Sequence, residues 1–411
     1  MKHGKTMTAA EAGPRGEKVR SDACVRVEPE TSGKVVVTVR GKVASLYGDA
    51  ITAQMTEGCA ALGVEHARVI VDDGGALPFV LAARLEAAVR RAECGTPNAE
   101  FLLARRPGNR GPSEKGRHRR TRLYVPGGRP NFMANAHLHA PDGVILDLED
   151  SVAPAEKDAA RVMVRCALRS LDWGDAERMV RINPLPGGIR DLPFAVGHGA
   201  QMILIPKVES AAQVEEVAAE CARLAHGCGE GAPWILPILE SAAGVLAAAE
   251  IAAAHTTVAA VTIGLEDYTA DIGAQRTAGG RESLWARCRV VAAARAAGVQ
   301  PLDSVHSDVA DEDGLREAVR EARSLGFDGK GCIHPRQIRV VHEAFAPTAE
   351  ELAHAKAVVV AFEKALSEGS AVVALGSRMI DPPVVKRALR TVDLAVGTGI
   401  LSSGWREGEN A

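Results

Sequence analysis

Short runs of apolar residues alternate with longer, alanine-rich stretches along the chain after residue 118. The runs read as buried strands, and the stretches between them, such as residues 211–226, have the spacing of helices. Eight strands are predicted, at residues 122–127, 143–150, 178–184, 202–210, 234–241, 258–268, 300–308 and 329–337. Strands that alternate with helices in this way predict a parallel sheet, and eight of them predict a closed (β/α)8 TIM barrel.

The chain before the linker has a different pattern. Residues 23–30 and 33–41 alternate between apolar and polar positions, and the turn between them predicts a β-hairpin. Further elements are predicted as a helix at 49–62, a strand at 66–71 and a helix that ends near Arg91. Together they predict a small α+β domain.

A compositional change separates these two parts. Residues 96–118 are rich in Gly, Pro, Arg and Lys and show little apolar periodicity, which is typical of a linker. The basic run KGRHRRTR has no interleaved aromatic residues and the net charge of the chain is -3, so we interpret it as a solvated linker and not as a nucleic-acid patch. The predicted organisation is therefore an α+β domain (1–95), a linker (96–118) and a barrel domain with a C-terminal extension (119–411).

Global properties exclude several classes of protein. No apolar run approaches the roughly 20 residues that a membrane helix needs, and the N-terminal residues contain no apolar signal segment. The eight cysteines show no CxxC spacing and read as reduced thiols. These features predict a cytoplasmic enzyme of more than one domain.

Acidic residues end two neighbouring predicted strands. Glu240 follows the run WILPIL, and Glu266 and Asp267 follow VTIGL. Active sites of TIM barrels lie at the carboxyl ends of the strands, so these carboxylates are expected to converge. Converging carboxylates repel each other without a cation, and Mg²⁺ is the first candidate for a site of hard oxygen ligands.

Other polar side chains at strand ends predict a pocket for an anionic substrate held by Mg²⁺ and arginine. They are Arg120, Asp147, Glu149, Asp150, Arg181, Asn183, Lys207, Glu209, Asp303, His306, Asp308, His334 and Arg336. The acids of DLED could equally cap the following helix. Arg181 is interpreted as a ligand of a substrate carboxylate in preference to a buried ion pair, and Lys207 and His334 are interpreted as structural.

Several longer motifs occur in order from about residue 118 to 390. They are RLYVPG, DLEDSVAPAEKDAAR, VRIN, IPKVES, ILES, GLEDY, DSVHSD, GFDGKGCIHPRQI and RMIDPPV. With these motifs the barrel segment resembles the citrate lyase beta subunit, in the HpcH/HpaI aldolase and citrate lyase family. The resemblance implies a Mg²⁺-dependent TIM barrel.

The same resemblance assigns roles to individual residues. The metal ligands of the family fall on Glu240 and Asp267, and its substrate-carboxylate arginines fall on Arg181 and Arg120. The acid of the C-terminal MID motif falls on Asp381, which in related thioester lyases reaches into the pocket of a neighbouring subunit. This implies a homo-oligomer whose sites are completed in trans.

The N-terminal domain resembles the citrate lyase gamma subunit, an acyl carrier protein, in SDACVRVEP, SLYGDAI and VDDGGALPFVLAARLEAAV. That family attaches a phosphoribosyl-dephospho-CoA arm to a serine just before the first strand. Aligned without a gap, the acceptor serine falls on Arg20, and Ser21 occupies the next column. Either Ser21 carries the arm after a one-residue shift, or the arm is absent.

The resemblances imply cleavage of a citryl thioester to oxaloacetate and an acetyl thioester, with a citrate lyase alpha (transferase) subunit as a partner. Arg181 would hold a substrate carboxylate and Asp381 would exchange a proton at the acetyl enolate. One alternative is a lyase for free CoA thioesters such as malyl-CoA or citramalyl-CoA. An alternative of another class is a non-catalytic scaffold of a lyase complex, which would need none of the four residues Glu240, Asp267, Arg181 and Asp381.

Overall fold

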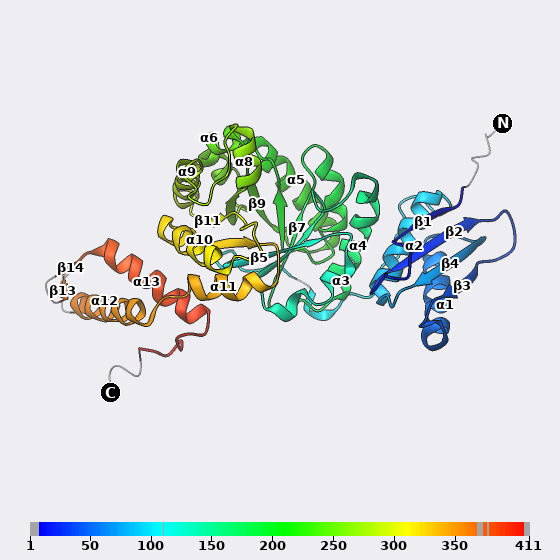
Figure 1. Ribbon diagram of the computed structural model, residues 1–411, viewed down its shortest axis with the longest axis horizontal. Helices are drawn as coiled ribbons and strands as arrows, with labels where there is room; N and C mark the ends of the chain where they lie inside the picture. The colour runs from blue at the N-terminus through cyan, green and yellow to red at the C-terminus, as the bar shows by residue number, and fades with distance from the viewer. Residues whose placement is uncertain (1–7, 110, 368–372, 376–377, 407–411) are drawn as a thin grey trace.

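The computed structural model describes residues 8–109, 111–367, 373–375 and 378–406. A small α+β domain, a central barrel and a C-terminal helical pair follow one another along the longest axis of the molecule (Figure 1). None of the helices in the described ranges combines the length and the apolar character needed to cross a membrane. All eight cysteines are free thiols.

Eight parallel strands form the barrel, which closes through the pairing of β12 with β5 and confirms the predicted fold class. They are β5 (Thr121–Pro126), β6 (Gly143–Asp147), β7 (Glu177–Arg181), β8 (Met202–Ile205), β9 (Trp234–Leu239), β10 (Ala260–Ile263), β11 (Gln300–Asp303) and β12 (Gly329–Cys332). Strands such as β8 are buried along their whole length, because one face lines the barrel interior and the other is covered by helices. Most strands end earlier than predicted, so many of the candidate residues lie in the turns beyond them.

The helices between the strands carry recognisable local signals. Helix α10 (Glu312–Leu325) begins after Asp311, whose side chain accepts the N–H of Gly314, and ends at Gly326 in the left-handed region at φ 100°. The remaining helices of this domain are α3 (Pro130–Met133), α4 (Lys157–Ser170), α5 (Ala211–Cys228), α6 (Ala242–Leu246), α7 (Ala248–Ala253), α8 (Leu265–Asp271), α9 (Leu284–Ala296) and α11 (Arg336–Phe345). Short 3-10 turns occur at Ala136–His139, Pro154–Glu156 and Gly187–Phe194.

The N-terminal domain is a four-stranded sheet in the order β1-β2-β4-β3, packed on two helices. Its elements are β1 (Ala10–Ala12), β2 (Ala23–Pro29), β3 (Val36–Arg40), α1 (Ala44–Ala61), β4 (Ala67–Asp73) and α2 (Pro78–Ala92). The predicted hairpin between β2 and β3 was wrong, because β4 lies between them and pairs antiparallel with β2 and parallel with β3. The 18-residue helix α1 supplies the crossover that a parallel β3-β4 pair requires.

Helix α2 joins the small domain to the barrel. It is buried on nearly all sides, because it lies between its own sheet and helix α4 of the barrel, and one continuous apolar core runs through both. Across this interface Glu86 pairs with Arg165, with both side chains fully buried, and Arg91 pairs with Asp158 at 2.7 Å. The two domains are therefore docked on each other.

The connection over residues 96–118 holds one short 3-10 turn, Pro107–Asn109. Most of its described residues are exposed, as predicted, but it is also bonded to the rest of the chain at several points. The amide of Asn109 donates to the carbonyls of Leu168 and Leu171, and the N–H of Phe101 donates to Glu86. The linker is thus pinned along the barrel and cannot act as a free tether.

The C-terminal extension consists of α12 (Ala349–Ser367), β13 (Val373–Leu375), β14 (Arg378–Ile380) and α13 (Pro382–Gly397). The two helices pack against each other around an apolar cluster of their own and extend away from the barrel, at the end opposite the N-terminal domain (Figure 1). Asp381 caps the start of α13 by accepting the N–H of Val384 at 3.1 Å.

Candidate functional site

A pocket of about 480 Å³ opens at the carboxyl ends of the barrel strands. Its floor contains Arg122, Tyr124 and Thr262, which point into the barrel interior. Its acidic residues lie at or shortly beyond the carboxyl ends of four strands, as Asp147, Asp150, Glu240, Glu266, Asp267 and Asp303. The structure thereby brings together the carboxylates that the sequence placed at the ends of β9 and β10.

Glu240 is the buried member of the central acidic pair. It follows β9 directly, is 5% exposed, and its Oε1 accepts the backbone N–H of Lys207 at 2.7 Å. Gly264 is required beside it, since a Cβ there would stand 2.5 Å from Glu240 Oε2. Burial, and then the nearby charge of Asp267, raise the pKa of Glu240 to about 8.

Asp267 faces the same pocket from the first turn of α8 and is about half exposed. The ammonium of Lys207 stands 3.8 Å from its Oδ1 and 3.7 Å from Oε1 of Glu149. The backbone of Lys207 is in the left-handed region at φ 53°, which is uncommon for a residue with a side chain. Lys207, which the sequence analysis interpreted as structural, therefore places a positive charge between Asp267 and Glu149.

Arg181 is held by the acids of the DLED turn. It pairs in bidentate fashion with Asp147, at 2.6 and 2.8 Å, and lies 2.6 Å from Glu149. Its guanidinium also stacks over Tyr124 at 5.1 Å. Burial alone would lower the pKa of Arg181, but the bond to Asp147 outweighs it and raises that pKa. Arg181 therefore forms the buried ion pair that the sequence analysis considered as the alternative to a substrate ligand. This pair lies at the edge of the pocket.

The prediction that the acids of DLED cap the following helix was wrong, because neither the 3-10 turn Pro154–Glu156 nor α4 has a side-chain cap, and Asp147 bonds within its own turn instead. Asp147 accepts the backbone N–H groups of Glu149 at 3.0 Å and Ser151 at 3.2 Å. Glu149 is almost fully buried, and its carboxylate forms ion pairs with Arg181 at 2.6 Å and Lys207 at 3.7 Å but has no well-oriented hydrogen bond within the described residues. Burial is the main cause that raises its pKa to about 7.

Three of the residues to which the family resemblances assigned a role lie outside this pocket. Arg120 precedes β5, at the amino end of the barrel, and pairs with Asp142 at 2.8 Å, so it cannot bind a substrate at the opposite end. Asp381 lies on the C-terminal extension of the same chain. Ser21 lies in the N-terminal domain before β2, with φ 55° and its N–H bonded to the carbonyl of Gly74.

Sequence reasoning missed the two inward residues of β5. Arg122 and Tyr124 are two positions apart on the strand and so share its inner face. An arginine at such a position in an apolar strand was the available signal, but attention went to the residues at strand ends. Arg120 was chosen for the same reason, although Arg122, two residues further on, is the arginine of this strand that lines the pocket.

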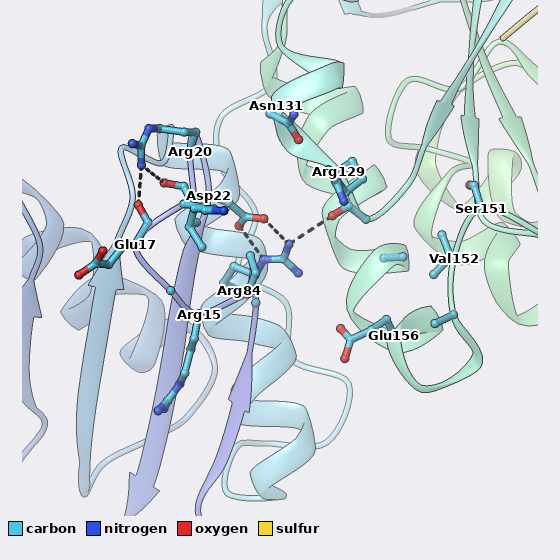
Figure 2. A pocket seen from close by; sticks show the side chains of 18 residues that line it. Arg15, Glu17, Arg20, Asp22, Arg84, Arg129, Asn131, Ser151, Val152 and Glu156 are labelled. Carbon is cyan, nitrogen blue, oxygen red and sulfur yellow. Dashed lines mark hydrogen bonds and ion pairs between the residues drawn. The ribbon is translucent and has the colours of Figure 1, made fainter. Parts of the chain in front are cut away.

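A second cavity, of about 860 Å³, lies between the N-terminal domain and the barrel (Figure 2). Arg84 reaches across it from α2, bonded to Asp22 at 2.8 and 3.0 Å and to the carbonyl of Gly128 at 3.3 Å. The cationic side chains lining the cleft are Arg15, Lys18, Arg20, Arg84 and Arg129, and the anionic ones are Glu17, Asp22 and Glu156. Ser151 lines both this cleft and the barrel pocket, so the two cavities adjoin.

Glu240 and Asp267 form the pair best suited to a divalent cation. Over the described residues no group of three or more His, Cys, Asp or Glu side chains is placed to hold a metal. Mg²⁺, however, is commonly held by one or two carboxylates and completed by water and substrate oxygens. A raised pKa at Glu240, caused in part by Asp267, is the expected signature of a pair that a cation would stabilise.

Comparison with known proteins agrees with this geometry. Residues 120–335 match the family HpcH/HpaI aldolase/citrate lyase, and residues 16–92 match the acyl carrier protein family described as malonate decarboxylase delta subunit (MdcD). The citrate lyase subunit beta of Escherichia coli (strain K12) is 40% identical over 290 residues, which cover 70% of this chain and 96% of that protein. This chain belongs to the HpcH/HpaI aldolase/citrate lyase family. It is a carbon–carbon lyase with an acyl-carrier-like domain at its N-terminus.

Two further relatives show the range of the family. The L-malyl-CoA/beta-methylmalyl-CoA lyase of Cereibacter sphaeroides (strain ATCC 17025 / ATH 2.4.3) is 34% identical over 300 residues, covering 67% of this chain and 94% of that lyase. The structure of CitE from Mycobacterium tuberculosis, in complex with magnesium, acetoacetate and coenzyme A, matches with a TM-score of 0.57 at 36% identity and covers 69% of this chain and 99% of that one. Members of the family therefore differ in the thioester that they cleave.

Proposed function

We propose that this protein is a Mg²⁺-dependent lyase that cleaves a citryl group carried as a thioester on its own N-terminal domain, giving oxaloacetate and an acetyl thioester. The observation that carries the proposal is that the two cavities lie next to each other and share Ser151 as a lining residue. The residues on either side of Ser21 line the interdomain cleft, and Ser151 joins that cleft to the barrel pocket. A carrier domain docked at the entrance of a lyase site is the arrangement that a tethered substrate needs.

Glu240 and Asp267 would hold the metal. When bound there, Mg²⁺ acts as a Lewis acid that stabilises the negative charge developing on the substrate oxygen as the carbon–carbon bond breaks. The magnesium in the CitE complex of M. tuberculosis supports this assignment. The bond from the backbone of Lys207 holds the Glu240 carboxylate in place before the substrate arrives.

The reaction moves one proton from oxygen to carbon. The citryl hydroxyl loses its proton to a carboxylate of the pocket, and the bond between the hydroxyl-bearing carbon and the thioester methylene breaks. The electron pair of that bond forms the acetyl enolate, which takes a proton at its methylene carbon from the carboxyl group of Asp381 of a neighbouring copy. The proton left on the pocket carboxylate then passes through solvent to Asp381, so that one proton in total moves from oxygen to carbon. Arg181, fixed by Asp147, places a cation beside the carboxylates of the substrate.

The position of Asp381 supports a site shared between copies. It lies on the helical pair that extends away from its own barrel (Figure 1), where it cannot serve its own pocket without a large movement. The proposal therefore includes a homo-oligomer, together with a transferase subunit that loads the carrier domain.

The relative that cleaves malyl-CoA and beta-methylmalyl-CoA supports a second candidate, a lyase for free CoA thioesters such as malyl-CoA or citramalyl-CoA. The presence of Arg20 at the acceptor position favours it as well. In that case the cationic cleft would receive the CoA portion of a free thioester, and Ser21 would stay unmodified.

The mass of the protein isolated from its native host separates these candidates. We expect an added mass equal to that of a phosphoribosyl-dephospho-CoA arm, and peptide mapping over residues 15–30 should place it on Ser21. The S21A variant should lose the adduct, whereas S45A, at an exposed serine of α1, should keep it. An unmodified peptide in the wild-type protein would overturn the tethered-substrate proposal in favour of free CoA thioesters.

The affinity for Mg²⁺ should rise with pH. Because the pKa of Glu240 is raised to about 8, its carboxyl group is mostly protonated below that pH, and Mg²⁺ must displace the proton. Isothermal titration calorimetry should show affinity increasing from pH 6 to pH 8.5, with proton release on binding in the lower part of this range. An affinity that stays constant over this interval would mean that Glu240 does not bind the metal.

A further inference from the structure

Arg122 is a buried cation on the floor of the barrel pocket. It points inward from β5, is 1% exposed, and lines the pocket together with Tyr124 and Thr262. Its neighbours in the strand ladder are glycines, Gly331 on β12 and Gly143 on β6. No side chain of an adjacent strand can therefore place a counter-charge beside it at this level.

The guanidinium of Arg122 is only partly bonded. Its Nη2 donates to the carbonyl of Asp303 at 2.9 Å and contacts the hydroxyl of Thr262 at 3.4 Å. Its Nε and Nη1 have no hydrogen-bond partner among the residues that the structure describes. Four other buried arginines are paired with a carboxylate, and they are Arg84, Arg119, Arg165 and Arg287. Arg178, which does not line this pocket, donates to the carbonyl of Gly199 and forms no ion pair among the described residues.

The nearby acid does not neutralise this cation. The carboxylate of Asp303 is bonded to Lys330 at 2.8 Å and to Arg287 at 3.1 Å, so two other cations already share it. A buried guanidinium without an anionic partner is unfavourable, because it has lost its hydration without regaining equivalent bonds. An anion that enters the pocket and reaches the floor would supply what is missing.

The position of Arg122 relative to the acidic pair defines the shape of that anion. Thr262, which Arg122 contacts, is level with Ile238 on β9, and Glu240 lies two residues further along that strand. The two sites are therefore one inward layer apart, about 7 Å along the strand. A small keto acid with one carboxylate occupies only the position beside the acidic pair. A keto acid with a carboxylate at each end reaches both the acidic pair and Arg122.

We propose that Arg122 binds the second carboxylate of the keto acid and thereby determines which thioester is cleaved. This inference rests on the proposed lyase function. The three candidate substrates differ in the group on the hydroxyl-bearing carbon, which is hydrogen in malyl, methyl in citramalyl and a carboxymethyl group in citryl thioesters. Of these groups the carboxymethyl group alone offers an anionic partner to the guanidinium of Arg122. Arg122 then selects substrates whose keto acid product is a dianion.

The test measures binding of the keto acids themselves, with Mg²⁺ present and without a thioester. In the R122M variant, which keeps most of the volume, oxaloacetate should bind about 10- to 100-fold more weakly, because a charge-assisted bond is lost. Pyruvate, which has no second carboxylate, should bind within about twofold of its wild-type affinity. R122K should recover part of the affinity for oxaloacetate, since it restores the charge without the planar fork.

The wild-type protein offers a second measurement that needs no variant. It should bind fresh oxaloacetate at least about tenfold more tightly than 2-oxobutanoate, which has the same carbon chain and no second carboxylate. Equal affinities here, or equal losses for oxaloacetate and pyruvate in R122M, would overturn the role of Arg122. Selective binding of oxaloacetate by a protein that cleaves no thioester would instead overturn the proposed function and leave the anion site intact.

Discussion

Replacing Glu240 by glutamine should lower kcat/KM for thioester cleavage by at least about a thousandfold. The metal is expected to supply several kcal/mol of transition-state stabilisation, and Glu240 is the buried ligand that we propose for it. The E240Q protein should fold normally, because the pKa of Glu240 is about 8 and a neutral side chain already occupies this position near pH 7. Steady-state kinetics measures the effect on turnover, and calorimetric titration measures the effect on the affinity for Mg²⁺.

E209Q is the matched control for this variant. Glu209 has the same side chain, is exposed, and accepts the hydroxyl of Ser241 at 2.7 Å without lining the pocket. Its replacement should change kcat/KM by no more than about twofold, in keeping with an ordinary surface change. If E240Q kept both its affinity for Mg²⁺ and its turnover, the metal would have to lie elsewhere.

Replacing Glu86 by alanine should destabilise the protein by about 3–5 kcal/mol. Glu86 is fully buried on α2 and binds Arg165 of α4, Arg90 at 2.8 Å and the N–H of Phe101 at 2.9 Å. Its loss leaves the buried guanidinium of Arg165 with Glu100 alone, at 2.6 Å. The free energy of unfolding, from urea titration, is the quantity to measure.

The interface offers its own control in Arg91. Its pair with Asp158 also joins α2 to α4, but the Asp158 side chain is 48% exposed and water can replace the interaction. R91A should therefore lower the free energy of unfolding by no more than about 1 kcal/mol. The double variant E86L/R165M should recover most of the stability lost in E86A, since neither member of the pair is then left unpaired. If E86A and R91A lowered the free energy of unfolding by similar amounts, burial would not be what makes the Glu86–Arg165 pair more stabilising than the Arg91–Asp158 pair.

The fold could be read from the sequence wherever burial is uniform. The barrel strands are covered on both faces, so runs such as Met202–Ile205 are apolar throughout and stand out from the helices. The order of strands in the N-terminal sheet could not be read in this way. A turn at Ser32 suits a hairpin, but β2 pairs with β4 along its whole length, and this long-range pairing leaves β3 only the other edge of β4.

The contacts of the linker also could not be predicted from local sequence. Its composition predicts an irregular segment, and apart from one 3-10 turn it has no regular structure. Composition does not show that Asn109 and Phe101 find partners on α4 and α2, because those partners are distant in sequence. The docked position of the N-terminal domain depends on these contacts.

The sequence by itself determined the (β/α)8 fold and the strand-end carboxylates of Glu240 and Asp267, because strand periodicity and strand-end positions are local properties, and the resemblance of its N-terminal motifs indicated the carrier-like domain. The tertiary structure decided which charges meet. Arg120 is neutralised by Asp142 at the amino end of the barrel, whereas Arg122, two residues later, lies unpaired on the pocket floor. The closure of the sheet brings β5 beside β12 and places Arg122 against Thr262 and Asp303, and only that closure sets the charge of the pocket.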